Sequence, residues 1–341
     1  MTDPFALPEA TLAAYLTEHV AGFSGPLTAT KFKGGQSNPT YLIEAASGAY
    51  VLRRKPPGQL LASAHAVDRE FRVLSALAST PVAVARPLHL CRDDALIGSM
   101  FYLMSHVPGR IYWDPSLPEL ETSQRSAYYD EILRVLAALH AVDVNAAGLA
   151  DYGKPGNYFA RQLKRWGEQY RASELGRIDA METLIAWLEA HVPADDGAVS
   201  LVHGDWRIDN LIFAADRPQI RAVVDWELST LGHPLSDLGY FCMALRLPRN
   251  PVIPGLQGID RAAAGIPGEA AIVARYAELS GRERFADWPF ILAFNFFRLA
   301  AIAQGVAKRA TQGNASSSQA DATGRMVPVI AALGMEAASG G

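Results

Sequence analysis

The residues best suited to chemistry lie between positions 203 and 225. They form the run His-Gly-Asp-Trp-Arg-Ile-Asp-Asn, and an aspartate follows fifteen positions after its last residue. Phosphoryl transfer needs a carboxylate near the attacking hydroxyl and oxygen ligands for magnesium. Magnesium prefers a few hard oxygens, which Asp and Asn supply. The spacing therefore predicts Asp205 as the catalytic carboxylate and Asn210 and Asp225 as magnesium ligands.

This run resembles the catalytic loop of the aminoglycoside phosphotransferase family, in which His-Gly-Asp is followed by four residues and Asn. The resemblance implies an α+β, protein-kinase-like fold of two lobes, with an antiparallel-sheet N-lobe and a mainly helical C-lobe. It also implies Mg2+, ATP as co-substrate and a small-molecule substrate with a hydroxyl group. In this pattern Asp205 matches the catalytic base, and Asn210 and Asp225 match the metal ligands. An isolated His-Gly-Asp is more often a turn, but here all the partners follow in order.

Two further residues complete the predicted site: Arg207 within this run, as a second catalytic residue, and Asp237 beyond it. Arg207, two positions after Asp205, could reach the transferring phosphate or could be a solvated loop arginine. Asp237 stands where the resembled family has an aspartate that opens a helix. By that resemblance, Asp237 is expected to accept hydrogen bonds from backbone amides of the catalytic loop.

The elements that would position these residues change character along the chain. The first third predicts strands over 27–33, 40–44, 49–53, 86–91 and 100–106, with helices over 12–20 and 65–78. From position 124 helices dominate, interrupted by short strands at 199–202 and 220–225. We therefore expect a nucleotide-binding lobe over 1–107, a hinge near 104–109, and a helical lobe over 108–341 that holds the catalytic loop and the acceptor site. A nucleotide cleft between the lobes is the natural expectation.

A charged pair is predicted inside the first lobe. Glu70 shares a helical stripe with apolar residues, and a buried carboxylate needs a partner. Kinases pair a basic residue of the third strand with a helix glutamate. Arg53 and Lys55 lie on one face of the third strand, where the resembled family has Lys. We favour Arg53 as the phosphate-binding residue, because Pro56 ends the strand beside Lys55.

Two backbone segments are further nucleotide-binding candidates. Gly34, Gly35 and Ser37 lie in a turn between two strands, where glycine would let amides approach phosphates. An ordinary hairpin turn explains this segment equally well, since the Gly-x-Gly-x-x-Gly spacing is absent. Residues 101–109 resemble the family's inter-lobe hinge, which implies that backbone groups of Ser105 and Val107 meet the adenine edge.

Composition limits the class of protein. The 341 residues are 50% hydrophobic and 19% charged, with a net charge of −4, which indicates a globular protein without a nucleic-acid or membrane partner. Two cysteines fit a reduced, cytoplasmic setting, and no signal peptide is expected from the first residues. The apolar stretch 290–306 is interrupted by Asn295, Arg298 and Gln304, so we expect no transmembrane helix. The oligomeric state stays open.

The acceptor is the least constrained part of the prediction. From position 237 onward ten basic and eight acidic residues leave a surplus of two positive charges, which disfavours a polycationic substrate. Arg298 and Arg309 share helical spacing and could form a basic face, for substrate or merely for solvent. The segments 50–58 and 106–110 are similar to kinase-like domains fused to acyl-CoA dehydrogenases, which implies a hydroxyacyl-CoA or similar anionic alcohol.

Three alternatives remain at this point. One is an aminoglycoside phosphotransferase, and another is a nucleotide-binding pseudokinase that acts as a scaffold. The presence of Asp205, Asn210, Asp225 and Glu70 weakens the pseudokinase, which usually lacks one such residue. The third is a metal-dependent hydrolase, which would want more His or carboxylate ligands than the sequence places.

Overall fold

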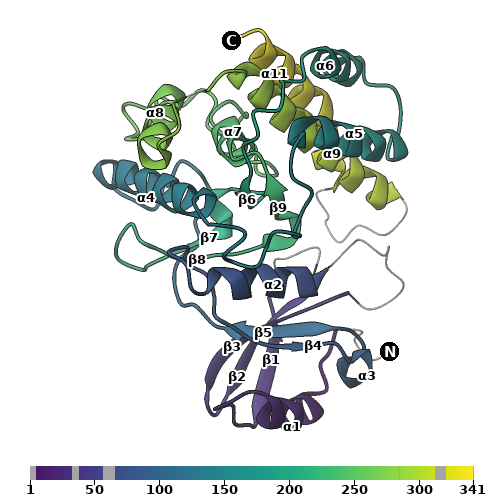
Figure 1. The fold of residues 1–341 in the computed structure, drawn as a ribbon, viewed down its shortest axis with the longest axis vertical. Coiled ribbons are helices and arrows are strands. Elements are labelled where there is room, and N and C mark those ends of the chain that lie inside the picture. Colours follow the sequence, from purple (N-terminus) through teal and green to yellow (C-terminus); the bar gives the residue numbers. More distant parts are fainter. Residues whose placement is uncertain (1–4, 33–37, 57–65, 284, 312–319, 341) are drawn as a thin grey trace. The chain divides into compact units, whose positions relative to one another are not determined.

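The computed structural model describes the chain except for residues 1–4, 33–37, 57–65, 284, 312–319 and 341. The chain divides into two compact units (Figure 1). The strand-rich unit comprises Met1–Arg110 together with Ile212–Ala215 and Arg221–Glu227. The helical unit comprises Ile111–Leu211, Asp216–Ile220 and Leu228–Gly341. The predicted α+β class is confirmed, but two segments assigned to the second lobe from sequence pack with the first.

Within the described part of the strand-rich unit, five strands form one antiparallel sheet in the order β1-β2-β3-β5-β4. Their bounds are β1 Leu27–Lys31, β2 Thr40–Ala45, β3 Gly48–Arg54, β4 Pro87–Cys91 and β5 Phe101–Ser105. The period of two along β3 sends Leu52 and Arg53 to opposite faces of the sheet. Leu52 pairs in register with Leu103, and Arg53 pairs with Tyr102. One face is thus apolar, and the other carries a buried charge.

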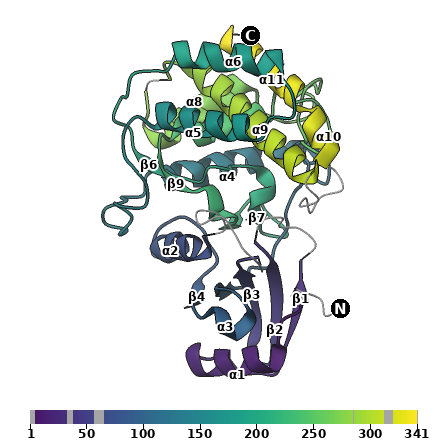
Figure 2. The ribbon, with the colours of Figure 1, turned by 90° about the vertical axis from the view of Figure 1, so that its right-hand side faces the viewer.

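Helices cover both faces of this sheet. Helix α1 (Glu9–His19) packs Leu12 and Leu16 onto the apolar face, in a core with residues of β2, β3 and β5. Helix α2 (Val67–Leu77) contacts β4 and β5 and brings Glu70 to the face that carries Arg53. Figure 2 shows α1 beside β1 and β2, and α2 beside β4. A short helix, α3 (Asp94–Ile97), connects β4 to β5.

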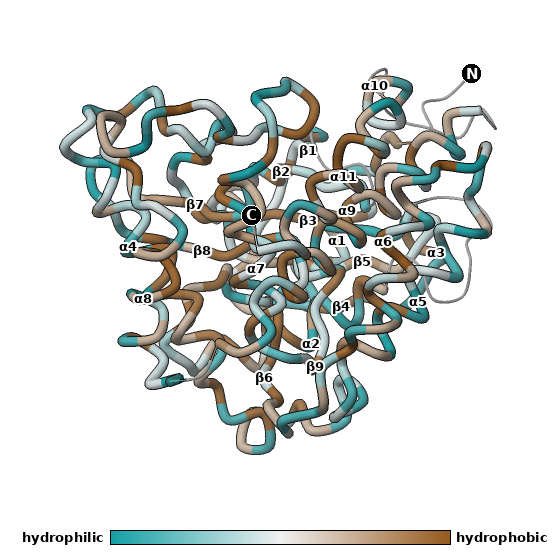
Figure 3. Tube along the Cα trace, turned by 90° about the horizontal axis from the view of Figure 1, so that it is seen from above, coloured by the Kyte–Doolittle hydropathy of each residue, from teal (hydrophilic) through white to brown (hydrophobic). Residues whose placement is uncertain are grey.

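The helical unit is built around one long helix, α9 (Trp288–Thr311), which contacts α5, α6, α7, α10 and α11. The bounds of the other helices are α4 Thr122–His140, α5 Tyr158–Ala172, α6 Asp179–Ala190, α7 Leu235–Met243, α8 Glu269–Ser280, α10 Ala320–Arg325 and α11 Val327–Ala338. Gly334 of α11 allows its close packing, because a Cβ there would lie 2.7 Å from Leu184 and 3.1 Å from Phe296. The alternation of hydrophilic and hydrophobic residues along α4 and α5 can be followed in Figure 3.

Helix α9 is long and apolar enough to cross a membrane by length and composition alone. However, 89% of its most apolar window is buried inside the protein. Among the described residues no other helix passes the same test. The apolar character of α9 is therefore explained by its central place in the helical unit.

Short elements precede and follow the run 203–210 in the sequence. Strand β6 (Ser200–Val202) pairs with β9 (Thr230–Gly232), and β7 (Leu211–Phe213) pairs with β8 (Ile220–Val223). The 3-10 turns η1 (Ile208–Asn210) and η2 (Trp226–Leu228) follow the loop after β6 and the loop after β8. The sequence placed Asp225 at the end of a strand. In the structure β8 ends at Val223, and Asp225 lies beyond it with a left-handed φ of 65°.

Candidate active site

In the helical unit, the catalytic-motif loop is attached to the protein core through its backbone amides. Asp237, at the start of α7, accepts a hydrogen bond from the His203 amide at 2.7 Å and another from the Gly204 amide at 2.8 Å. The same carboxylate lies 3.2 Å from Nε2 of His140, whose Nδ1 is 2.7 Å from the Tyr276 hydroxyl. Asp237 thus makes the backbone contacts expected from the resemblance, and His140 belongs to the same buried network.

The side chain of Asp205 is held from several sides. The amide nitrogen of Asn210 donates to its backbone carbonyl at 2.9 Å and to its Oδ2 at 3.0 Å. The Tyr240 hydroxyl favours the ionised form of the same carboxylate. Burial alone would raise the pKa of Asp205, but Arg207, His203, Tyr240 and Arg298 together bring it below its ordinary value. Asp205 is therefore an ionised, oriented carboxylate at neutral pH.

Arg207 is an ion-pair partner in this structure. Its Nε lies 3.2 Å from Oδ1 of Asp205, and its Nη2 lies 3.2 Å from Oδ2 of Asp209. The side chain is 45% exposed, so it has room to change partners. The geometry is compatible with a guanidinium that neutralises the loop carboxylates and can turn toward a phosphate.

In the strand-rich unit, Arg53 gathers three carboxylates. Its Nε lies 2.9 Å from Oε2 of Glu70, and its Nη2 lies 2.7 Å from Oδ1 of Asp225 and 3.5 Å from Oε2 of Glu227. Burial would lower the pKa of Arg53, but the carboxylates of Glu70 and Asp225 raise it above its ordinary value. The guanidinium is therefore a permanent charge, and the set of four side chains carries net negative charge.

Glu70 is buried and has a complete set of donors. Its Oε1 accepts from the Asn38 amide at 2.8 Å, and its Oε2 accepts from the Tyr102 hydroxyl at 3.0 Å. Burial raises the pKa of Glu70, and Arg53 only partly offsets that rise. The inference from sequence that this carboxylate needs a buried partner agrees with the observed contact to Arg53.

The sequence reasoning missed Glu227. It lies two positions after Asp225 and shares its Arg53 partner. The sequence signal that could have identified Glu227 is the run Asp-Trp-Glu, in which two acidic residues are separated by a single position.

Asn210 of the helical unit and Asp225 of the strand-rich unit are the two predicted magnesium ligands. Asn210 uses its amide nitrogen on Asp205, which leaves its carbonyl oxygen as the ligand atom. Asp225 is a carboxylate whose side chain is 33% exposed. Hard oxygen donors of this kind fit Mg2+. Neither residue belongs to a cluster of three or more His, Cys, Asp or Glu in the described chain, so the donors do not form a cage made by protein alone.

The remaining predicted nucleotide-binding residues divide into two groups. Gly34, Gly35 and Ser37 lie outside the described residues. Ser105 is the last residue of β5, and its amide already donates to the Arg86 carbonyl at 2.9 Å. An adenine contact at Ser105 would consequently involve its carbonyl oxygen rather than its amide. Val107 lies just beyond the strand.

A small cavity of about 50 Å³ opens beside the catalytic loop in the helical unit. Apart from Arg207 and Asp209, its walls are mostly apolar: Trp113, Pro115, Trp206, Ile208, Tyr240, Phe241, Met243, Ala244, Leu247, Ile253, Pro254 and Leu299. Trp113 is 64% exposed, which is unusual for so large an apolar side chain. The cavity combines an apolar wall with the loop that carries Asp205.

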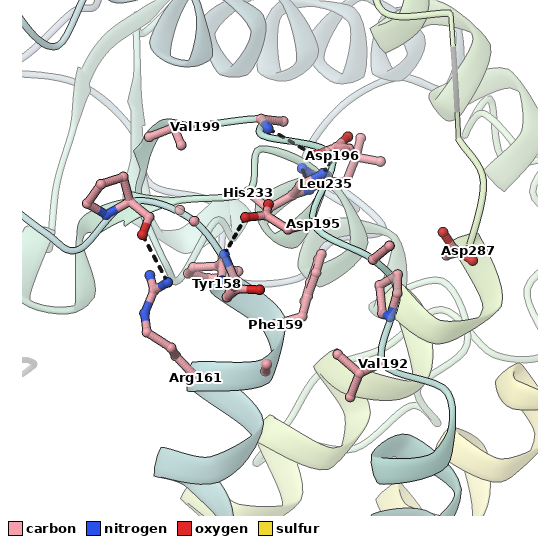
Figure 4. Close-up of a pocket in the computed structure, with 18 of the residues that line it drawn as sticks. Tyr158, Phe159, Arg161, Val192, Asp195, Asp196, Val199, His233, Leu235 and Asp287 are labelled. Carbon is pink, nitrogen blue, oxygen red and sulfur yellow. Dashed lines mark hydrogen bonds and ion pairs between the residues drawn. The ribbon is translucent and has the colours of Figure 1, made fainter.

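A larger cavity of about 300 Å³ lies elsewhere in the helical unit, around the start of α5 (Figure 4). Two of its acidic residues have partners within the protein: Asp195 accepts from the backbone amide of Asn157 at 2.7 Å, and Asp196 lies 3.4 Å from His233 and 3.5 Å from Arg282. None of the described residues that line it is a predicted site residue. Its size alone therefore does not make it the active site.

One prediction about the acceptor side is wrong. Arg298 does not form a surface face with Arg309, because it is only 3% exposed. It lies 5.4 Å and 5.3 Å from the ring centres of Trp166 and Tyr240, and its Nη2 donates to the Gly204 carbonyl. Helical spacing places both arginines on one stripe, but this stripe turns inward at Arg298 and reaches solvent only at Arg309.

Comparison with known proteins supports the kinase-like interpretation. A sequence profile of the phosphotransferase enzyme family matches residues 28–279, which include Arg53, Glu70, the loop of Asp205 and Asn210, and Asp225, but not Arg298. Acyl-CoA dehydrogenase family member 10 of Mus musculus is 46% identical over 336 residues, covering 98% of this chain and 31% of that protein. The chain thus spans about a third of this relative. The predicted similarity to kinase-like domains of such proteins is confirmed.

Solved structures agree with the fold. A Ralstonia eutropha protein assigned provisionally to the aminoglycoside phosphotransferases has a TM-score of 0.88 and 47% identity, covering 98% of this chain and 99% of that one. A thermostable mutant of aminoglycoside phosphotransferase APH(4)-Ia, in a ternary complex with AMP-PNP and hygromycin B, has a TM-score of 0.64 and 14% identity, covering 97% and 99%. The latter likeness concerns the fold alone. The predicted kinase-like fold is confirmed.

Proposed function

This chain belongs to the phosphotransferase enzyme family, and on that premise we propose that it transfers the γ-phosphoryl group of ATP to a hydroxyl of an anionic small molecule, with a hydroxyacyl-CoA as the first class to test. The observation that carries the proposal is the loop after β6. There an ionised Asp205 is oriented by Asn210, by Tyr240 and by the backbone contacts of Asp237. Positioning and electrostatics supply most of the catalysis in phosphoryl transfer.

In this proposal Asp205 accepts the proton of the acceptor hydroxyl. Arg207, released from its carboxylate partners, offsets charge on the transferred phosphoryl group. Asn210 and Asp225 would supply oxygen ligands for Mg2+, whose charge would offset that of the phosphates. Glu227 is a further carboxylate beside Asp225.

The nucleotide is assigned to the strand-rich unit. Arg53 would hold phosphate oxygens while Glu70 fixes its direction, because Glu70 is the partner that burial keeps in place. The Ser105 carbonyl and the Val107 amide would meet adenine. Gly34, Gly35 and Ser37 would approach the phosphates through their backbone.

The support for the acceptor class differs from what sequence suggested. The basic surplus of the last third is a weaker argument, since Arg246, Arg275 and Arg282 are paired with acids and Arg298 is buried. The apolar wall beside the catalytic loop instead favours an acceptor with an aliphatic segment near its hydroxyl. The relatives named as acyl-CoA dehydrogenase family members point to acyl-CoA chemistry. We place the reaction in the reducing cytoplasm, because Cys91 and Cys242 are free.

The provisional assignment of the Ralstonia eutropha relative favours a second candidate, phosphorylation of an aminoglycoside. A hydrophobic wall offers a polycationic sugar few partners, so we rank this candidate lower. A scaffold without catalysis is the third alternative. The three differ in which acceptor, if any, gains a phosphoryl group.

One experiment separates them. Purified protein is incubated with magnesium and ATP and with a panel of hydroxyacyl-CoA esters, the matching free acids, kanamycin and hygromycin B. Mass spectrometry then detects the product, because each transferred phosphoryl group adds about 80 Da to the acceptor. Asp205→Asn is the inactive control. Phosphorylated hydroxyacyl-CoA supports the proposal. A phosphorylated drug, with resistance when the protein is expressed in a susceptible bacterium, would overturn the acceptor class, and nucleotide binding without any product would indicate a scaffold.

A further inference from the structure

The peptide groups of the catalytic loop are held one by one. The His203 and Gly204 amides both donate to Asp237. The carbonyl of Asp205 accepts from Asn210. Between these, the peptide that joins Gly204 to Asp205 has its own two contacts: its amide donates to Nδ1 of His203 at 3.2 Å, and its carbonyl accepts from Arg298 of α9.

The burial of Arg298, which this contact requires, lowers the stability of the fold. Its Nε and Nη1 have no hydrogen-bond partner among the residues that the structure describes. Its charge acts on the Asp205 carboxylate, but the two groups form no direct ion pair in the described chain. Buried donors without partners, and buried charges without a direct ion pair, both destabilise a fold. Stacking between the Trp166 and Tyr240 rings offsets only part of that cost. An apolar side chain would pack here more cheaply, so stability alone does not explain the guanidinium.

Gly204 explains why its carbonyl needs a fixed donor. Its φ is +83°, and a Cβ would lie 2.6 Å from the Leu228 carbonyl oxygen, so the position requires glycine. Glycine without a Cβ can rotate the peptide that follows it at low cost. Such a rotation would move the backbone of Asp205 and misdirect its carboxylate. A donor on the Gly204 carbonyl prevents this.

We propose that Arg298 is a positioning residue that locks the Gly204–Asp205 peptide and thereby aims the Asp205 carboxylate. A second contact acts in the same direction, because Arg298 also stacks on Tyr240, whose hydroxyl favours the ionised form of Asp205. Arg207 is exposed and changes partners during the proposed reaction, whereas Arg298 stays in place. The inference rests on the proposed role of Asp205.

The test compares Arg298→Met and Arg298→Lys with Arg309→Met, which removes an exposed guanidinium from the same helix. Hydrogen–deuterium exchange of the peptide that covers residues 203–210 measures how readily the loop amides open, and it needs no substrate. Steady-state kinetics with magnesium, ATP and the hydroxyacyl-CoA that the wild type phosphorylates report turnover. Misplacement of a catalytic group by about 1 Å costs roughly 10²-fold in rate.

We expect Arg298→Met to accelerate exchange at 203–210 at least tenfold, to lower kcat by about 10²-fold and to leave KM for ATP within about threefold. Arg298→Lys, which keeps one donor, should recover part of both losses, and Arg309→Met should match the wild type. Unchanged exchange in Arg298→Met would overturn the inference. If Arg298→Met does not fold, wild-type exchange and kcat in Arg298→Lys would do so as well. Failure of the wild type to phosphorylate any acceptor would instead refute the proposed function, and the exchange measurement would still decide the role of Arg298.

Discussion

The guanidinium of Arg53 joins Glu70 to Asp225: its Nε lies 2.9 Å from Glu70, and its Nη2 lies 2.7 Å from Asp225. An arginine can do this because its donors spread over a planar fork, whereas a lysine is a single point charge. This one contact connects a helix residue to a predicted magnesium ligand within the strand-rich unit, and it explains how arginine can serve where the resembled family has lysine.

Replacing Arg53 tests that connection. Arg53→Lys should fold and bind magnesium-ATP about tenfold more weakly, because one ammonium cannot contact both carboxylates. Arg53→Met should lower the free energy of unfolding by about 3–5 kcal/mol, since it leaves Glu70 buried without its counter-ion. Calorimetry and urea titration measure the two effects. Arg92→Met is the control, because the Arg92 side chain is 65% exposed in its ion pair; this variant should change neither ATP binding nor the free energy of unfolding. Equal binding by Arg53→Lys and the wild type would contradict the assignment.

Asp205→Asn should lower turnover by about 10²–10⁴-fold, the usual contribution of a general base, while nucleotide affinity stays near that of the wild type. The amide keeps the shape of the side chain but cannot accept the proton. Single-turnover kinetics and a nucleotide titration on the same preparation give the comparison. Turnover near the wild-type rate would remove Asp205 from the catalytic role.

Asp225→Ala should weaken magnesium-dependent ATP binding more than Asn210→Ala does. A carboxylate offsets the charge of the ion, whereas an amide contributes only a dipole. Asp225→Ala also takes one partner from Arg53. Titration calorimetry with ATP, with and without magnesium, separates the metal term from the arginine term. Equal losses in both variants, or losses that do not depend on magnesium, would argue against this pair of ligands.

Asp237 predicts a pH dependence of stability. Burial would raise the pKa of Asp237, but hydrogen bonds from His140 and the Gly204 amide, with the charge of His203, hold it below its ordinary value. A carboxyl whose pKa is lower in the folded state stabilises the fold above its unfolded pKa of about 3.9, and this stability is lost as the pH falls toward the folded pKa.

Asp237→Asn should therefore lower the free energy of unfolding by about 1–3 kcal/mol at pH 7, because one loop amide loses its acceptor. The difference from the wild type should shrink as the pH falls below about 4. Denaturant titrations at several pH values between about 3 and 7 would measure this difference. Asp216→Asn, at a 75% exposed side chain, is the matched control. A constant difference at every pH would show that the charge of Asp237 is not what matters.

Replacing Trp113 tests whether the apolar wall of the cavity beside the catalytic loop binds the acceptor. Trp113→Ala should raise KM for a hydroxyacyl-CoA about tenfold and leave KM for ATP unchanged, because burying a large apolar side chain against a ligand is worth about 1.5–3 kcal/mol when complete and less when partial. Leu175→Ala, another exposed apolar residue of the helical unit that lies outside this cavity, is the control. An unchanged KM for the acceptor would place the substrate elsewhere.

The sequence alone determined those features that depend on near neighbours. Alternation along β3 set Arg53 and Leu52 on opposite faces, and helical spacing turned Glu70 toward the sheet. The motif that contains Asp205 and Asn210 was recognisable from its residue types and spacing, which resemble a phosphotransferase catalytic loop. The structure adds that the two side chains are in contact, through a hydrogen bond of 3.0 Å.

Tertiary structure decided what depends on packing between distant segments. Arg298 and Gly204 are 94 positions apart, and periodicity along α9 cannot reveal which side of that helix faces the core. The same holds for His140, which meets Asp237 across 97 positions. The left-handed conformation of Asp225 likewise follows from the path of the chain beyond β8 rather than from residue type. Arginines at helical spacing look the same in the sequence whether they face solvent or the interior. Only the packing of other helices around them decides which of these groups lose contact with water.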